Sequence, residues 1–472
     1  MTLGCKLFAA LLILSSGAIP GQSTFAQSRV ALHATLEEID IWKQRRINGP
    51  YLDDWTRILA RANSFKANPS GTWNGNTMNS CWSAGVPGRT IAEPIRDAAF
   101  VYMLANDVSY STPVRTKLLE QVAITGTDFS NRTKWCTDMD IAGTGFEIGI
   151  WLRRLTYAYD YIKPTLSAQD KTNIEAWLLN AGEYFSLVID NRIKRCFPNR
   201  ASNDYRISCG SANKNVTHHN GYMTQNHMGV FANKETLWSS AIAAIAVVLN
   251  DQALIDASVK YAKEWLRFAV FPDGTVYDQH RWINLQSSPG NPGSGYGYAT
   301  TAIGSMMSIV DHLQRRGQSL YEYTTSEGAG NTVGGPKSFG LVVERIAKMQ
   351  QHLVDVYGSE DATLTECKRI DDFLDRAVSG CTQFSTSHRI VNDMAPMAQT
   401  NVFYKNNTVA AAYSRTPHSS PTSGGYDAFG GDWGNYPGAR FMFGQMEGRV
   451  WPYTTASRSS PHAPTELTVD AR

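Results

Sequence analysis

Residues 237–265 read LWSSAIAAIAVVLNDQALIDASVKYAKEW, and this stretch decides the fold class. The apolar run over 237–249 has the length of a buried helix. Asp251 follows it as the N-cap of a second helix. In that second run, apolar side chains recur at helical spacing at Leu254, Ala257, Tyr261 and Trp265. The stretch therefore predicts two consecutive helices.

Helix start signals recur along the rest of the chain. They are Thr35 with Glu38, Thr112 with Pro113, and Ser167 with Asp170. Further helical stretches cover about 91–105, 146–162, 299–314 and 339–356. Alternation of period two is nearly absent before about residue 400. We therefore predict an all-α chain of helical hairpins and, by analogy with other chains of this kind, an incomplete α/α toroid with a groove at one end.

The first 26 residues have the features of a secretory signal peptide. Lys6 gives a positive start, residues 7–14 form a short apolar core, and Ala26 is a small residue at a plausible cleavage point. The apolar core is too short to span a membrane. We therefore expect a secreted or periplasmic protein.

Beyond this leader we expect one toroid domain over residues 27–400. The section 401–455 changes character, because 402–404 and 409–413 read as strands. We expect it to be a small irregular or β-containing section packed on the toroid. Residues 456–472 read as a disordered tail.

Six cysteines remain after the leader, and an even number in an exported chain favours disulfides over a metal site. Pairing between neighbours in the sequence gives Cys81–Cys136, Cys196–Cys209 and Cys367–Cys381. Six cysteines allow 15 pairings, so other connectivities stay open.

The charge of the chain limits its partners. A net charge of +2 argues against a nucleic-acid-binding protein held by bulk electrostatics. Basic residues are nevertheless dense over 192–195 and at Arg200, Arg206 and Lys214. They are suited to line subsites for an anionic polymer, or they form an ordinary solvated charge run.

Chemistry-bearing residues follow that basic segment. Asn226 and His227 stand ahead of a long helical run, and Arg281 and Tyr298 come after it. Each has a plain structural alternative: a helix cap, a packed histidine, a surface ion pair and a core tyrosine, respectively. The order of the whole set is more specific than any one member.

Asparagine, histidine, arginine and tyrosine together suit β-elimination from a uronic acid polymer. The C5 proton is α to a carboxylate and is hard to remove while that carboxylate is charged, so donors must neutralise it. Another group then takes the proton, and an acid protonates the leaving O4. A tyrosine whose pKa is lowered by nearby positive charge can do both.

Other side chains are candidate substrate contacts, although those on a helix partly belong to the core. They are Tyr296, His280, His219, Arg206, Trp135, Arg153 and Tyr157. His218 and His219 are adjacent rather than at HxxxH spacing, and no carboxylate stands at a matching offset. We therefore expect no metal and no cofactor.

These motifs together resemble the alginate lyase family of polysaccharide lyases. The matching pieces, spread over roughly half the chain, are Ile95-Arg96-Asp97-Ala98-Ala99, Trp151-Leu152 through Tyr157 to Asp160, Gln225-Asn226-His227, Asp273-Gly274-Thr275 to Arg281, and Tyr298-Ala299. The resemblance implies an incomplete α/α toroid with a deep groove for an anionic sugar chain.

The resemblance also implies roles for the ordered set. Asn226 and His227 would neutralise the carboxylate with help from Arg281, and Tyr298 would be base, acid or both. The chain departs from the family at residue 225, where Gln replaces a common Asn, and in the loop 283–295. This loop keeps Tyr296 open as an alternative to Tyr298, and His227 remains an alternative base.

We therefore predict a polysaccharide lyase acting on mannuronan or glucuronan, with guluronan left open, and giving 4,5-unsaturated uronate ends. One rival is a glycoside hydrolase on uronic-acid oligosaccharides, for which Asp273 and Asp278 are the candidate carboxylate pair. The other is a non-catalytic polysaccharide-binding protein. The expected partner is an anionic polysaccharide, without nucleic acid or membrane, and the expected state is a monomer.

Overall fold

The computed structural model confirms the all-α prediction. Helices account for 79% of the described residues, and the strands β1 (Arg29–Ala31), β2 (Ala34–Thr35), β3 (Thr324–Thr325) and β4 (Lys337–Ser338) form only two short antiparallel pairs. The structure describes residues 29–32, 34–73, 91–126, 129, 146–196, 229–278, 292–328, 335–357, 394, 397–414 and 438–446.

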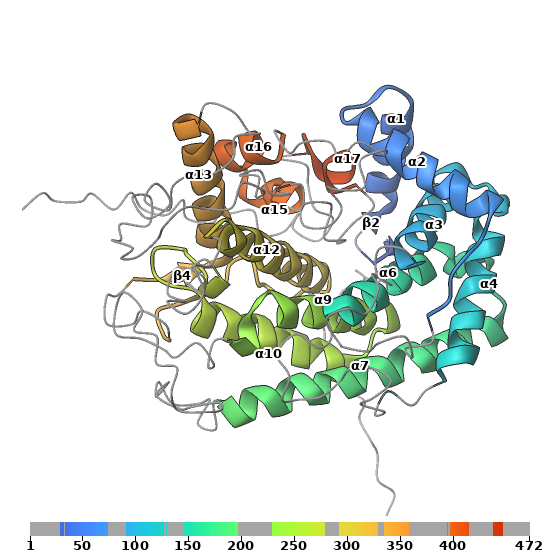
Figure 1. Cartoon of the computed structure of the whole chain (residues 1–472), viewed down its shortest axis with the longest axis horizontal. Coiled ribbons are helices and arrows are strands. Elements are labelled where there is room, and N and C mark those ends of the chain that lie inside the picture. Colours follow the sequence, from blue (N-terminus) through green and yellow to red (C-terminus); the bar gives the residue numbers. More distant parts are fainter. Residues whose placement is uncertain are drawn as a thin grey trace, which may run out of the picture.

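The described helices form an inner and an outer layer of a ring (Figure 1). The inner helices, each packed against the next, are α3 (Glu93–Ala105), α6 (Phe146–Ile162), α9 (Asn233–Leu249), α12 (Pro292–Gln314) and α15 (Met397–Tyr404). Their outer partners are α4 (Val108–Thr125), α7 (Ala168–Cys196), α10 (Gln252–Ala269), α13 (Phe339–Tyr357) and α16 (Asn407–Ser414). This arrangement of consecutive hairpins is the predicted α/α toroid.

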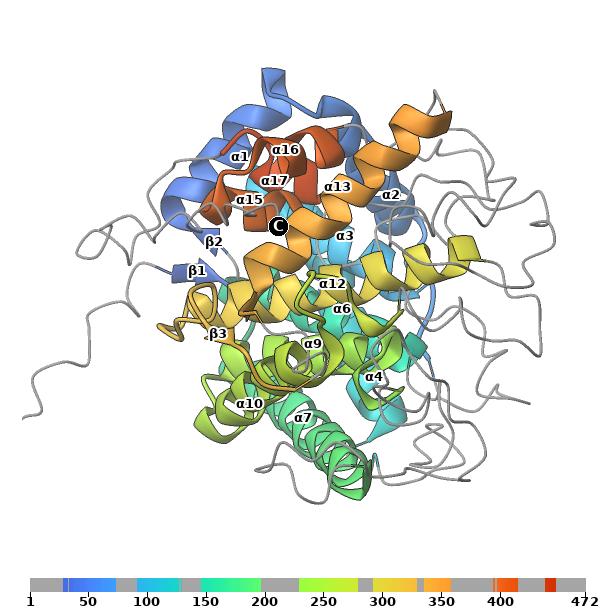
Figure 2. The same cartoon turned by 90° about the vertical axis from the view of Figure 1, so that its left-hand side faces the viewer.

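The two ends of the chain complete the ring. The helices α1 (Leu36–Asn48) and α2 (Leu52–Ala67) precede α3, and α17 (Ala439–Phe443) lies between them and α15 (Figures 1 and 2). The Trp42 indole donates to the Met442 carbonyl at 2.6 Å, and the Arg45 guanidinium donates to the Phe441 carbonyl at 2.8 Å. The ring of hairpins is therefore incomplete, and one short helix fills the remaining gap in place of a further hairpin.

Three hairpin turns are built in the same way. A residue in the left-handed conformation ends the inner helix, and an Asp or Asn side chain then caps the outer helix. The pairs are Asn106-Asp107, Asn250-Asp251 and Lys405-Asn406, with φ of 55°, 58° and 53° at their first residues. These tight turns all lie at one end of the ring, where the inner helices finish.

The connections at the opposite end are long. Residues 68–92, 126–145, 197–232, 270–291 and 358–396 each lead to the start of an inner helix. These five long connections therefore all reach the parallel inner helices at the same end of the ring, which we call the open end.

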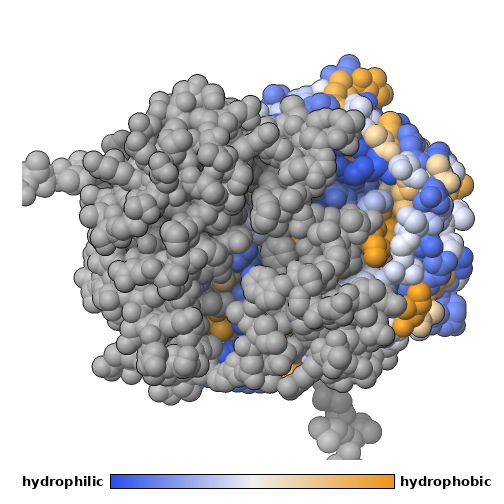
Figure 3. Space-filling view, in the orientation of Figure 1, coloured by the Kyte–Doolittle hydropathy of each residue, from blue (hydrophilic) through white to orange (hydrophobic). Residues whose placement is uncertain are grey.

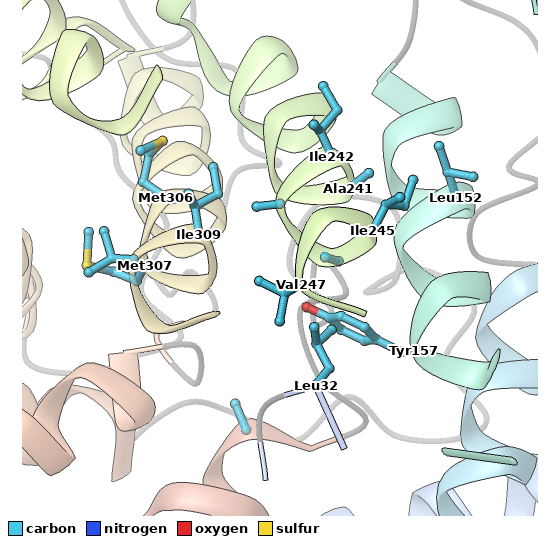
Figure 4. Close-up of a cluster of buried hydrophobic side chains, with 14 of the residues drawn as sticks. Leu32, Leu152, Tyr157, Ala241, Ile242, Ile245, Val247, Met306, Met307 and Ile309 are labelled. Atoms are coloured by element: carbon cyan, nitrogen blue, oxygen red, sulfur yellow. The ribbon is translucent and has the colours of Figure 1, made fainter. Parts of the chain in front are cut away.

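The other end of the ring interior is filled. His312 of α12 reaches Tyr157 of α6, with 2.9 Å between Nε2 and the phenol oxygen, although α9 lies between these helices in the ring. Leu32 is fully buried beside Tyr157 and Val247 (Figure 4), and its backbone N–H donates to the Asp160 carboxylate. We call this layer the floor of the ring.

The packing of the central inner helix α9 explains why its sequence is almost continuously apolar. It packs against α6, α7, α10 and α12, so nearly every side chain from Leu237 to Val247 is buried. Gly149 of α6 allows the close approach, because a Cβ there would lie 2.9 Å from the Trp238 ring. On the described part of the surface shown in Figure 3, hydrophobic side chains are interspersed with hydrophilic ones.

Two local predictions are wrong. Residues 402–404 and 409–413 belong to the helices α15 and α16, not to strands, because Phe403 stacks on Tyr321 with ring centroids 4.6 Å apart and Asn406 caps the second helix. Thr112 does not start a helix, because Asp107 caps α4 and places Pro113 inside it. The predicted boundary at residue 400 falls within α15.

Several other predictions concern residues outside the described ones. They are the signal peptide 1–26, the tail 456–472, and the cysteines Cys81, Cys136, Cys209, Cys367 and Cys381. Cys196 ends α7, and its side chain is not described.

A buried carboxylate near the floor makes the stability of the ring depend on pH. Burial raises the pKa of Asp311 from 3.8 to about 6; Arg315 opposes this shift and the charge of Glu38 reinforces it. The folded state thus binds this proton more tightly than the unfolded state. The resulting stability is complete below about pH 4 and is lost as the pH rises through 6.

We expect Asp311→Asn, which cannot ionise, to gain stability relative to the wild type as the pH rises from 4 to 7. The expected gain is on the order of 3 kcal/mol, from about 1.4 kcal/mol for each pKa unit. Urea denaturation at both pH values measures it. The same difference between variant and wild type at both pH values would contradict the assignment.

Candidate functional site

Most of the predicted site residues lie outside the described part of the chain. These are Asn226, His227, Arg281, Trp135, Arg206, His219 and His280. Tyr296 and Tyr298 are in the first turns of α12, where the backbone is described and their side chains are not. In the sequence, all of these residues fall within the long connections that lead to inner helices, or within the first turns of α12.

The described residues that flank the predicted catalytic set are tied together. The buried Asp278 carboxylate accepts a hydrogen bond from the backbone N–H of Asn233, with 2.8 Å between Oδ2 and N. His227 is six residues before Asn233, and Arg281 is three residues after Asp278. At about 3.3–3.6 Å per residue, neither can be more than roughly 20 Å from this bond.

Each flank is also fixed to the outer layer. The single-turn helix η4 (Gly229–Phe231) begins two residues after His227, and Trp265 of α10 donates its indole N–H to the Phe231 carbonyl at 3.1 Å. The Phe231 ring packs on Tyr261 and Phe268 at 5.7 and 5.8 Å between centroids. The described chain ahead of α9 is therefore anchored to α10.

The second flank begins with a tight turn. Gly274 has a φ of +81°, a conformation that favours glycine, and its N–H donates to the Phe271 carbonyl at 2.9 Å. Asp273 accepts bonds from both the N–H and the hydroxyl of Thr275. This turn reverses the chain after α10 and directs Asp278 toward the start of α9.

The helical register of α12 separates the two candidate tyrosines. Seven residues separate Tyr298 from Ser305, and seven more lead to His312, so the three positions share one face. His312 meets Tyr157 across the ring, which identifies this face as the one turned to the interior. Position 296 is about 200° away from position 298 around the helix.

Two predicted substrate contacts have described side chains, and both are fully buried. Arg153 donates to the Ser240 hydroxyl at 2.6 Å, which joins α6 to α9. Tyr157 bonds His312 at the floor. Tyr157 therefore lies far from the open end, because His312 follows Tyr298 by fourteen residues, or ~21 Å of helix.

A charged cluster that the sequence analysis did not assign lies where α3 begins. Glu93 approaches Arg61, Arg96 and Arg154 at 3.4–3.5 Å, and Asp97 pairs with Arg61 at 2.5 Å. Burial by itself raises the pKa of Glu93, but the surrounding guanidinium groups outweigh it and lower that pKa to about 2. The sequence signal was the presence of Arg-Asp and Arg-Arg pairs inside apolar helices.

The carboxylates proposed for a hydrolase have structural roles. Asp273 is exposed and holds the turn, whereas Asp278 is buried and bonded to the start of α9. One carboxylate is exposed and the other is buried against another helix, so they do not form the pair that a glycoside hydrolase requires. Among the described residues, no group of three or more His, Cys, Asp or Glu side chains is arranged to hold a metal ion.

None of the helices in the described ranges is long and apolar enough to cross a bilayer.

Comparisons with known proteins relate part of this chain to a known family. Residues 209–332 match the model of a family described as alginate lyase. No curated protein matches the chain. Among solved structures, an alginate lyase from Bacteroides ovatus aligns with a TM-score of 0.47 and 10% identity, covering 84% of this chain and 97% of that one.

The matched segment contains Asn226, His227, Arg281 and Tyr298 and includes the bond between Asn233 and Asp278. The resemblance read from the motifs is therefore confirmed, and over residues 209–332 the chain matches the alginate lyase family of polysaccharide lyases.

Proposed function

We propose that this chain is a polysaccharide lyase that cleaves an anionic polyuronate by β-elimination. The family match over 209–332 supports lyase activity in general. The observation that carries the finer proposal is the bond between Asn233 and Asp278, because it draws together the two connections that contain Asn226, His227 and Arg281. Tyr298 lies in the first turns of the neighbouring helix α12, at a position on its interior face.

The proposed division of labour follows from the chemistry. Asn226 and His227 donate to the uronate carboxylate, and Arg281 adds a positive charge, so that the C5 proton becomes acidic enough to remove. Tyr298 takes that proton and returns one to O4 as the glycosidic bond breaks. The C5–H electron pair becomes the C4–C5 double bond and the O4 side leaves as a hydroxyl. No cofactor enters the step.

The substrate is a polymer of mannuronate or glucuronate. These two sugars differ at C2 and share the geometry at C4 and C5, so one tyrosine-centred site serves both. Guluronate is inverted at C5 and presents its proton on the opposite face, so its cleavage would need a base on that face, for which His227 is the candidate with Tyr298 as the acid.

The purified protein is expected to raise the ultraviolet absorbance of mannuronan or glucuronan solutions, because each cleavage creates a conjugated C4–C5 double bond. The measurement uses a panel of mannuronan, guluronan, glucuronan and glycosaminoglycans, with product size followed in parallel. Smaller products without absorbance would identify a hydrolase instead. Tight binding without any product would identify a binding protein.

The same proposal includes export of the chain through the signal at 1–26, disulfides among the remaining cysteines and a monomeric state. Removal of the first 26 residues and loss of free thiols are measurable by mass spectrometry of the exported protein with and without reduction.

A further inference from the structure

Gln399 on the inner helix α15 has an unusual environment. Its side chain is fully buried, and neither Oε1 nor Nε2 has a hydrogen-bond partner. A buried polar group without a partner is destabilising, and the large majority of such groups in proteins are bonded. Gln399 is therefore placed to bond something other than the protein.

The register of α15 shows which way Gln399 points. Tyr404 lies against the outer helix α13, where a Cβ on Gly340 would come within 2.8 Å of its ring. Gln399 precedes Tyr404 by five residues and is about 140° away from it around the helix. It therefore faces away from the outer layer, into the ring. Thr400 precedes Tyr404 by one turn and shares its outward face.

Ser305 on the neighbouring helix α12 has the same property. It is 1% exposed, and its Oγ has no hydrogen-bond partner. It stands two turns before His312 on the face that meets Tyr157 across the ring. The adjacent inner helices α12 and α15 thus each present an unsatisfied hydroxyl or amide toward the interior, above the floor.

We propose that Gln399 and Ser305 form a sugar-hydroxyl subsite that sets which polyuronate the enzyme prefers. This inference rests on the proposed function. Ser305 follows Tyr298 by ~10 Å of helix, so the two side chains contact a sugar unit other than the one that loses its proton.

The chemistry of the pair fits a hydroxyl group better than a carboxylate. An amide and a serine hydroxyl both donate and accept, as a sugar hydroxyl does, and neither carries the positive charge that a buried carboxylate needs. Mannuronate and glucuronate differ in the direction of one ring hydroxyl, at C2. A buried amide and hydroxyl bonded to that group discriminate between the two, because the wrong epimer leaves them unpaired.

The test compares Gln399→Leu and Ser305→Ala with Thr400→Val as a matched control. Thr400 is also fully buried with an unpartnered Oγ1, but on the outward face of the same helix. For each protein, kcat and KM are measured on mannuronan and glucuronan, binding of both by calorimetry, and Tm by thermal unfolding.

Gln399→Leu is expected to change the ratio of kcat/KM for the two polymers by about 10-fold or more, mainly through KM. Its Tm should hold or rise, since an apolar group of similar shape removes an unsatisfied amide. Ser305→Ala is expected to change the same ratio in the same direction, and Thr400→Val to leave it within about 2-fold. The smaller Ser305 change keeps the test open if Gln399→Leu does not fold.

An unchanged ratio in a folded Gln399→Leu and in Ser305→Ala overturns the subsite, and so does an equal change in Thr400→Val. The binding data separate this result from a failure of the proposed function. A wild type that binds a polyuronate without cleaving it, and loses that binding in Gln399→Leu, keeps the subsite and rejects the lyase. A wild type that neither binds nor cleaves any polyuronate rejects both.

Discussion

Replacing Tyr298 by phenylalanine is expected to lower kcat by roughly 10²–10⁴-fold, the usual contribution of a positioned acid or base. The change removes one oxygen atom and keeps the ring. Because the carboxylate contacts belong to other residues, substrate binding should persist. The absorbance assay measures turnover on the polymer that the wild type prefers, and calorimetry measures binding.

Tyr296→Phe is the matched control for this change. It makes the same substitution two residues earlier, on a different face of α12, and should leave kcat within a few-fold of the wild type. If Tyr296→Phe loses activity and Tyr298→Phe keeps it, the catalytic role belongs to Tyr296. Full activity in both variants would reject a tyrosine-centred elimination and return the base role to His227.

Removing the carboxylate of Asp54 is expected to destabilise the whole ring. Arg440 of α17 binds Asp54 of α2 through Nε at 3.1 Å and Nη2 at 2.8 Å, and both side chains are 3% exposed. Asp54→Ala leaves the Arg440 guanidinium buried with the more distant, half-exposed Asp53. Loss of one partner of a buried pair costs about 3–5 kcal/mol, which urea denaturation would detect.

A second exchange isolates the ion pair from the loss of packing. Asp54→Ala with Arg440→Leu removes both charges of the buried pair, and most of the lost stability should return because the buried Arg440 guanidinium is gone as well. Arg57, which also binds Asp54 at 2.8 Å, is 19% exposed, so water can solvate it once Asp54 is removed. Asp40→Ala breaks the exposed pair with Lys43 and should change the free energy of unfolding little. Equal losses for Asp54→Ala and Asp40→Ala would show that the pair does not hold the ring closed.

Local signals in the sequence predicted the hairpins well. The periodicity and the Asp251 cap are properties of neighbouring residues, and they correctly predicted α9 and α10. Residues 402–404 and 409–413 of the eight-residue helices α15 and α16 were mistaken for strands because apolar runs this short do not distinguish a helix from a strand. Their helical state depends on tertiary contacts such as Phe403 on Tyr321.

The candidate catalytic residues were predicted from the sequence because their order along the chain is itself informative. The order of Asn226, His227, Arg281 and Tyr298 is visible in one dimension, and it led to the family that the match over 209–332 confirms. The hydrogen bond between Asn233 and Asp278 is not visible in this way, because its partners are 45 residues apart and each has an ordinary local role. The unsatisfied Gln399 emerges only once the burial of α15 is known.

The closure of the ring by α17 also sets the order in which the protein is able to fold. The bond from Trp42 to Met442 joins residues 400 positions apart, and the bond from Arg45 to Phe441 joins residues 396 apart. Contacts between residues this distant in sequence form late in folding, because the chain between them must first lose the conformational entropy of a long loop. The hairpins from α3 to α10 have local contacts and can form while the chain is still emerging, but the ring becomes a ring only when its last helix arrives.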